Sequence, residues 1–179
     1  MNFAEYNVKD ANLEEILLAL KSLDTVEAVA LGGSRSTGAS DENSDYDIYV
    51  YCTEIPTAET RENLRSAIIK NNRNLLNGKL PSYDRQIKKA QERGDIVSVN
   101  HRITAFLESY FDVIFALNRQ THPGEKRQVQ LCKKYCTLLP KDFEENINAL
   151  MKSISDGGSY EIVTAMVNNL DEILNDEFK

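Results

Sequence analysis

Hydrophobic residues recur along this chain at two different spacings. Near the N-terminus, leucine and isoleucine follow the three- and four-residue spacing of a helix, which predicts a helix over about residues 12–22. Two short apolar runs, at residues 26–31 and 45–52, have the length of β-strands, and the second is rich in Tyr, Ile and Val. The beginning of the chain is therefore predicted to be a small α/β unit.

After residue 56 the pattern is helical throughout. The strongest periodicity runs from residue 96 to 117, where apolar positions alternate steps of three and four and a second apolar row widens the stripe. Such a wide stripe predicts a helix at the centre of a bundle. Proline and glycine separate the other predicted helices, at about residues 58–72, 82–93, 125–139, 142–155 and 159–175. We expect two domains, 1–56 and 57–179, in an α+β fold that is mostly helical.

Charge and composition narrow the class of protein. The 179 residues include 21 Lys and Arg against 28 Asp and Glu, a net charge of −7. Nucleic acids are bound mainly by neutralising their phosphates, so this balance argues against DNA or RNA as the main partner. No apolar run approaches the roughly 20 residues of a membrane span, and no secretion signal opens the chain. With only three cysteines, a cytoplasmic protein is expected.

The first candidate chemistry follows the first predicted strand. That strand runs into Gly32-Gly33-Ser34-Arg35. Glycine lets backbone N–H groups approach a phosphate without a Cβ in the way. A serine hydroxyl and an arginine guanidinium add further hydrogen bonds to such an anion. By itself, however, a Gly-Gly-Ser sequence is also typical of an ordinary turn.

Two carboxylates open the second predicted strand. Asp45 and Asp47 are two residues apart, and strand side chains alternate between faces, so both are expected on one face. At ~3.3 Å per residue their Cα atoms lie roughly 6.6 Å apart. That separation lets both carboxylates reach one metal ion or a pair of ions, and oxygen-only ligands favour Mg²⁺. The alternative interpretation is a pair of solvated acids at the end of a loop.

Together these features resemble a known family. The Gly-Gly-Ser turn, the Arg-Ser-x-Gly that continues it, the Ser-Asp-x-Asp of residues 44–47 and the spacing between them are similar to the DNA polymerase β-like nucleotidyltransferase superfamily. The resemblance is in particular to minimal and antibiotic nucleotidyltransferases, and it is carried by residues 31–50. Residues 92–95, and residues 110–118 running on to 122–127, resemble the helical C-terminal domain of such proteins.

The resemblance implies an activity and a set of site residues. It implies Mg²⁺-dependent transfer of an NMP group from an NTP, with ATP expected, to a hydroxyl on a small molecule such as an antibiotic, or on a protein. Asp45 and Asp47 would be catalytic and would bind the metal. The residues that would bind the nucleotide are Gly32, Gly33, Ser34, Arg35, Ser44 and Lys126.

The chain departs from this family in one respect. Members carry a third carboxylate on a later strand, and this chain is predicted to have only a truncated α/β unit that lacks that strand. Glu54 lies too near the second strand to occupy another, and the apolar positions after Asp95 continue the long helical pattern. Two functions therefore stay open: an active enzyme, or a catalytically impaired module that binds a nucleotide or a partner, like an antitoxin. The small sheet also has an open edge, which suggests a homodimer.

Four further residues have two interpretations each. Tyr49 and Tyr51 share the strand face of the acidic pair, and they either pack on the sheet or stack on a nucleobase. His122 is either a structural residue of a turn or a contact to substrate or phosphate. Asp112, on the long helix, is either a tether between two helices or part of an acceptor pocket.

Overall fold

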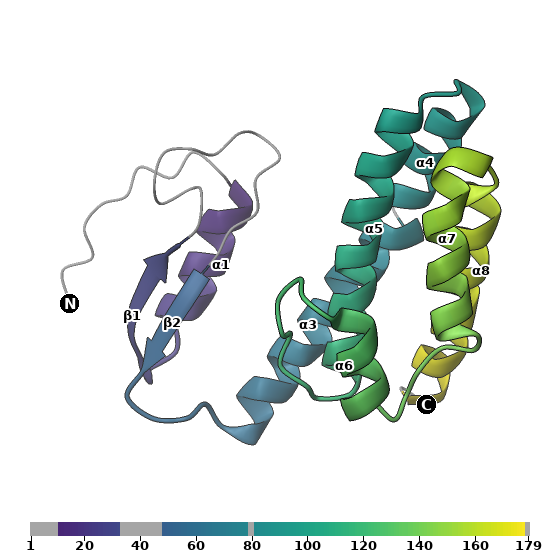
Figure 1. Ribbon diagram of the computed structural model, residues 1–179. Helices are drawn as coiled ribbons and strands as arrows, with labels where there is room; N and C mark the ends of the chain where they lie inside the picture. The colour runs from purple at the N-terminus through teal and green to yellow at the C-terminus, as the bar shows by residue number, and fades with distance from the viewer. Residues whose placement is uncertain (1–10, 33–47, 79–80, 178–179) are drawn as a thin grey trace. The chain divides into compact units, whose positions relative to one another are not determined.

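The computed structural model describes residues 11–32, 48–78 and 81–177. Contacts divide the chain into two compact units, residues 1–61 and 62–179. The boundary lies inside helix α3 (Ala58–Asn77), and the domain boundary expected between residues 56 and 57 stays a prediction. The elements are two strands and a larger set of helices, mostly in the second unit (Figure 1). This confirms the predicted α+β class with mostly helical content.

The first unit contains one helix and a two-stranded sheet among its described residues. Helix α1 (Ala11–Lys21) is followed by strands β1 (Val26–Leu31) and β2 (Ile48–Cys52), which pair antiparallel. A bulge interrupts the register between Val26 and Ala28. Helix α1 contacts β1, and the buried side chains of Leu13 and Val26 lie on these two elements.

The two faces of this sheet differ in exposure. From the register, Ala28 pairs with Tyr51 and Ala30 with Tyr49, so these four side chains share one face. All four are exposed, whereas Val29 and Leu31 on the other face are partly buried. The face with the tyrosines is therefore open in the part of the chain that the structure describes.

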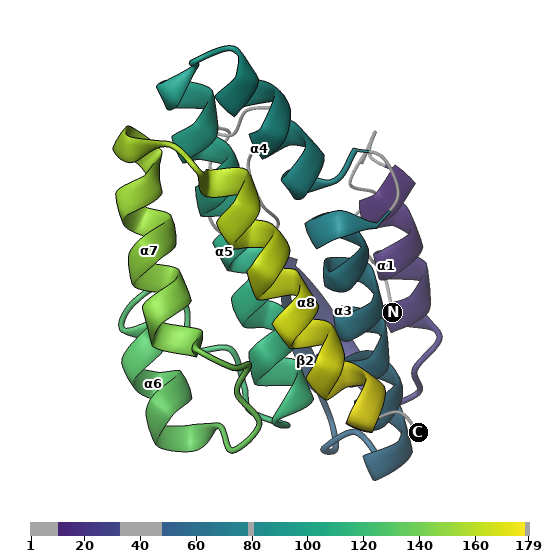
Figure 2. The same cartoon turned by 90° about the vertical axis from the view of Figure 1, so that its right-hand side faces the viewer.

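The second unit is helical. After α3 come five helices, and among them α5 spans the whole range expected from the periodicity. Helices α4, α6 and α7 contact α5, and α8 contacts α4 and α7 (Figure 2). Their bounds are α4 Tyr83–Glu92, α5 Ile96–Leu117, α6 Gln128–Tyr135, α7 Phe143–Asp156 and α8 Ser159–Glu177.

An aromatic cluster fills the core of the second unit. The ring of Tyr110 stacks on Phe106 at a centroid distance of 5.8 Å and on Phe143 at 6.5 Å, and it meets Phe111 edge-on. The Tyr110 hydroxyl is buried without a hydrogen-bond partner, and burial raises its pKa. The wide apolar stripe of α5 thus packs against several neighbouring side chains, as the sequence predicts.

Ion pairs attach α3 to α8. Arg73 forms a two-pronged pair with Asp171, and the buried side chain of Arg65 lies 4.0 Å from Glu177. A guanidinium matches a carboxylate in this fork geometry, so these contacts fix α3 along the helical unit.

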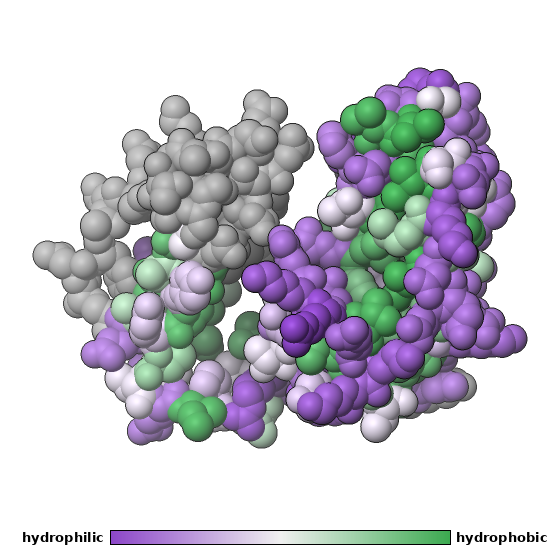
Figure 3. All heavy atoms as spheres, viewed as in Figure 1, coloured by the Kyte–Doolittle hydropathy of each residue, from purple (hydrophilic) through white to green (hydrophobic). Residues whose placement is uncertain are grey.

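The surface of the second unit carries apolar residues among charged ones. Figure 3 shows hydrophobic residues on the face in view, flanked by hydrophilic ones. Ile96 and Val97, at the start of α5, are 55% and 65% exposed. None of the helices in the described ranges has the length and apolar character to cross a membrane.

Candidate active site

The predicted motif is anchored at one end of the sheet. Gly32 directly follows β1, and Asp47 directly precedes β2 in the sequence. Leu31 and Ile48, the last and first residues of these strands, are paired partners in the antiparallel register. The chain therefore leaves the sheet and returns to it at neighbouring positions, with the motif in between.

The described residues hold only part of this motif. Gly32 is partly buried at the end of β1. The other predicted site residues of the first unit lie outside the described residues: Gly33, Ser34, Arg35, Ser44, Asp45 and Asp47. The roles assigned to them stay predictions.

Tyr49 of β2 lies next to this end of the sheet, and Tyr51 lies two residues further along the strand on the same face. Tyr49 and Tyr51 are 58% and 57% exposed. The small side chains opposite them, Ala30 and Ala28, leave the rings uncovered on their face. Packing in a covered sheet is thus not what the described residues show, and stacking on a base stays a prediction.

No strand follows β2 in the described part of the chain, and α3 begins six residues after it.

Two carboxylates of the second unit have structural roles. Asp84 accepts a hydrogen bond from the Ser82 hydroxyl at 2.6 Å. Asp95 caps α5, where it accepts hydrogen bonds from the hydroxyl and the backbone N–H of Ser98, and these lower the pKa of its carboxyl. The predicted position of Asp95 at a helix start is confirmed.

Lys126 lies in the turn before α6 and is exposed. The sequence predicts a helix from residue 125, and that start is wrong, because α6 begins at Gln128. Arg127 adopts the left-handed conformation, with φ 62°, and Gly124 has φ 81°. The chain cannot be helical through such residues, so Lys126 is presented on a turn instead of on the first turn of a helix.

A comparison with known families shows which family the chain belongs to. The family model of the polymerase β nucleotidyltransferases matches residues 14–136, which is more than half of the chain. The chain belongs to the polymerase β nucleotidyltransferase family. No curated protein and no solved structure matches it. The family match runs from α1 to just beyond α6, so the matched region includes residues of both units.

In this member of the family, a polar cluster forms at the C-terminal end of α5. The backbone N–H of Gly124 donates to Nδ1 of His122 at 3.1 Å, and the His122 ring meets Phe115 edge-on. A backbone N–H can only donate, so Nδ1 is the acceptor and the neutral ring carries its proton on Nε2. His122 Nε2 lies 3.1 Å from Nε2 of Gln128. A ring N–H at this position is paired only when the Gln128 amide is turned so that its oxygen faces the ring.

Asp112 completes this cluster. Its Oδ1 lies 3.8 Å from His122 Nε2. Burial raises the pKa of the Asp112 carboxyl, and the nearby His122 partly opposes that shift. The carboxylate therefore faces the connector between α5 and α6, and both interpretations of Asp112 stay predictions. The described residues include no group of three or more His, Cys, Asp and Glu that could hold a metal.

Asn118 fixes the other end of the same connector. Its side-chain amide donates to the carbonyls of Ile114 and Leu138, and its Oδ1 accepts from the N–H groups of Thr137 and Leu138 at 2.9 and 2.8 Å. Sequence reasoning missed this residue, because a single Asn at a helix end gives no signal of a partner twenty positions away.

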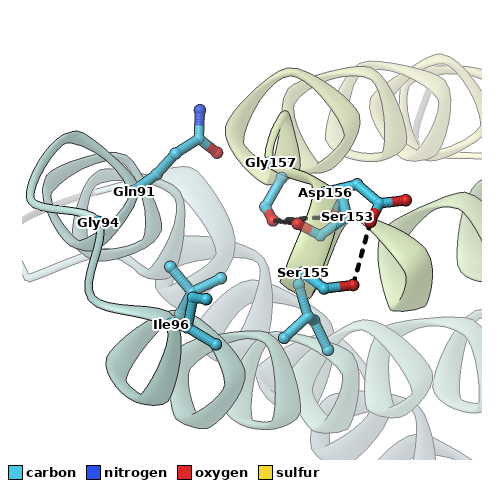
Figure 4. Close-up of a pocket in the computed structure, with 10 residues that line it drawn as sticks. Gln91, Gly94, Ile96, Ser153, Ser155, Asp156 and Gly157 are labelled. Atoms are coloured by element: carbon cyan, nitrogen blue, oxygen red, sulfur yellow. Dashed lines mark hydrogen bonds between the residues drawn. The ribbon is translucent and has the colours of Figure 1, made fainter.

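A hollow of about 250 Å³ lies between the α4–α5 turn and the α7–α8 turn (Figure 4). Its polar groups are already paired: Ser153 and Ser159 share a hydrogen bond of 2.8 Å, and Gln91 Oε1 accepts from the N–H of Tyr160 at 3.0 Å. None of the predicted site residues lines it. It includes Gly157, which opens a second Gly-Gly-Ser sequence in the chain.

Proposed function

We propose that this chain transfers an NMP group from an NTP, with ATP expected, to a hydroxyl acceptor in a Mg²⁺-dependent reaction. One observation carries the proposal: in a member of the nucleotidyltransferase family, the segment with the Gly-Gly-Ser turn and the acidic pair is attached to the paired residues Leu31 and Ile48. Both halves of the motif thus start from the same end of one sheet.

The donor chemistry of the motif fits the metal. Asp45 and Asp47 supply oxygen ligands only, which is the set that Mg²⁺ prefers alongside substrate phosphates. When bound there, Mg²⁺ would neutralise charge on the triphosphate. Gly33 and Ser34 would hold the phosphates through backbone N–H groups and a hydroxyl. Gly32 would bring this turn close to the sheet.

Further contacts to the nucleotide are assigned by residue type. The guanidinium of Arg35 suits bidentate binding of a phosphate, and the Ser44 hydroxyl adds a hydrogen bond next to the acidic pair. Lys126 is exposed on its turn and is the candidate from the second unit. We propose a small molecule or a protein side chain as acceptor, and the net charge of −7 suits a cationic one.

A cytoplasmic location is part of the same proposal. All three cysteines, Cys52, Cys132 and Cys136, are free, and burial raises the pKa of the last two. Free thiols suit a reducing compartment, where ATP and Mg²⁺ are also abundant.

Thermal unfolding with MgATP tests nucleotide binding. A ligand at 100 times its Kd stabilises a protein by about 2.7 kcal/mol. We expect MgATP to raise the Tm of the natural chain and of the Asp24→Asn control, which removes an exposed acid at the opposite end of β1 from Gly32. The Asp45→Asn/Asp47→Asn variant should lose the shift. An equal shift in all three proteins would refute the assignment of the acidic pair.

A second candidate function is a module that binds nucleotide or a partner without catalysis. It is favoured by the lack of a strand after β2 in the described residues, which leaves no strand there for a third carboxylate. Pyrophosphate release across a panel of hydroxyl acceptors separates the two functions. Release that depends on Asp45 and Asp47 supports the enzyme, whereas a MgATP shift with no release on any acceptor supports the module.

A further inference from the structure

Strand β2 has the sequence of a central strand but lies at an edge. Its five residues, Ile-Tyr-Val-Tyr-Cys, form an unbroken apolar run, which is typical of strands covered on both faces and flanked on both sides. Among the described residues β2 pairs only with β1. Tyr49 and Tyr51 on one face and Val50 on the other are 58%, 57% and 39% exposed.

The two edges of the sheet are protected differently. Natural sheets discourage pairing at an edge with bulges, charges or proline. Strand β1 has a bulge between Val26 and Ala28, and the extra residue is the exposed, charged Glu27. Strand β2 has no charge, no proline and no bulge. The unprotected edge is therefore that of β2.

A second copy of β2 fits this edge. A two-fold axis perpendicular to the sheet, midway between the two strands and level with Val50, pairs the strand with its copy antiparallel and in a single register. Val50 then faces Val50 of the copy, Tyr49 faces Tyr51 twice, and Ile48 faces Cys52 twice. Aromatic pairs opposite each other stabilise antiparallel strands.

Charge does not oppose a second copy at this edge. A chain with a net charge of −7 repels its own copies where charged surfaces meet. The β2 strand, residues 48–52, is uncharged. Two copies that meet along β2 therefore place no like charges opposite each other, and they complete the backbone hydrogen bonds of both open edges.

We propose that the β2 edge is the interface of a homodimer, in which two copies form one continuous four-stranded sheet. The contact is isologous, with the same five residues on both sides. It also supplies the additional strands that a two-stranded sheet needs for stability in water. The pairing involves no nucleotide, so its test is independent of the proposed transferase activity.

Light scattering and sedimentation of the full-length chain give the first test. We expect twice the chain mass of 20.3 kDa at micromolar concentration. The Tyr49→Lys/Tyr51→Lys variant places like charges opposite each other twice, so its dimer Kd should rise at least about tenfold. The control Ala28→Lys/Ala30→Lys puts the same charges on the same face of β1, and it should remain a dimer.

The Tyr49→Lys/Tyr51→Glu variant tests the register. Because residue 49 of one copy faces residue 51 of the other, this variant places opposite charges across the interface and should stay dimeric. A monomeric natural chain overturns the proposal. So does a dimer whose Kd is the same in the Lys/Lys and Lys/Glu variants, since it would use another surface or another register.

Crosslinking keeps the proposal testable if the charged variants fail to fold. In a Cys52→Ser background, Val50→Cys should give a covalent dimer on oxidation, because antiparallel partners lie about 4.5–5.5 Å apart at Cα. Ala30→Cys in the same background is exposed on β1 and should not crosslink. Crosslinking of Ala30→Cys with none at Val50→Cys would overturn the β2 edge as the interface.

Discussion

The two units of this chain differ in how they are held together. In the described part of the first unit the buried apolar side chains are Leu13 and Val26, around an open two-stranded sheet. In the second unit, a single helix, α5, already buries apolar residues along most of its length, and Phe106, Tyr110 and Phe111 are among them. Most of the predicted site residues thus lie in the unit with few buried side chains, and most of the hydrophobic core lies in the other unit. Loss of activity and loss of stability should therefore be separable by substitution.

Truncation of the aromatic cluster should have the largest effect. Phe106 is fully buried against Tyr110, so Phe106→Ala should lower the free energy of unfolding by about 3–5 kcal/mol, through lost burial and the cavity that remains. Urea unfolding followed by circular dichroism at 222 nm measures this effect. Val97→Ala, on the exposed side of the same helix, should change it by less than about 0.5 kcal/mol.

A smaller and local effect is expected in the first unit. Val26 is buried on β1, and Val26→Ala removes two methyl groups, a loss of about 2 kcal/mol. Amide hydrogen exchange should accelerate in α1, β1 and β2 and stay unchanged in α5. If exchange in α5 accelerates equally, the two units unfold together and the contrast between them is wrong.

The smallest effect concerns Asp112. Burial raises the pKa of this carboxyl, so the folded state holds its proton more tightly than the unfolded state. The contribution of Asp112 to stability is therefore fully present below pH 3.8, its ordinary value, and is lost as pH rises through the raised pKa. Stability of Asp112→Asn relative to the natural chain should rise with pH across this window and level off above it. Urea titrations from pH 3 to pH 7 measure the difference, and a flat difference would contradict the burial of the carboxylate.

The long helix and the family were predictable from the sequence for the same reason. Each signal spans many residues: the stripe of α5 runs over 22 positions, and the motif joins a strand, a glycine turn and two acids. Element ends were less predictable. Helix α3 continues to Asn77 instead of residue 72, because Leu75 and Leu76 extend its apolar pattern and Gly78 ends it. A Cβ at Gly78 would lie 2.7 Å from the carbonyl oxygen of Asn74.

The contacts around the α5–α6 connector could not be predicted. His122 and Asp112 are ten positions apart, and the chain between them turns at Arg119, which has a positive φ of 56°. An arginine rarely adopts such an angle, so the sequence gives no sign of this turn. The contact between Asp112 and His122 thus depends on a backbone path that only the structure provides, and both interpretations of His122 stay predictions.

The second Gly-Gly-Ser sequence has a consequence for recognising enzymes of this family. Gly157 and Gly158 both have φ 83° and simply turn the chain from α7 into α8. The same three letters therefore occur twice in one polypeptide, once after a strand and once between two helices. The tripeptide carries little information by itself. A strand before the tripeptide and an acidic pair after it distinguish the family motif from a chance match in another sequence.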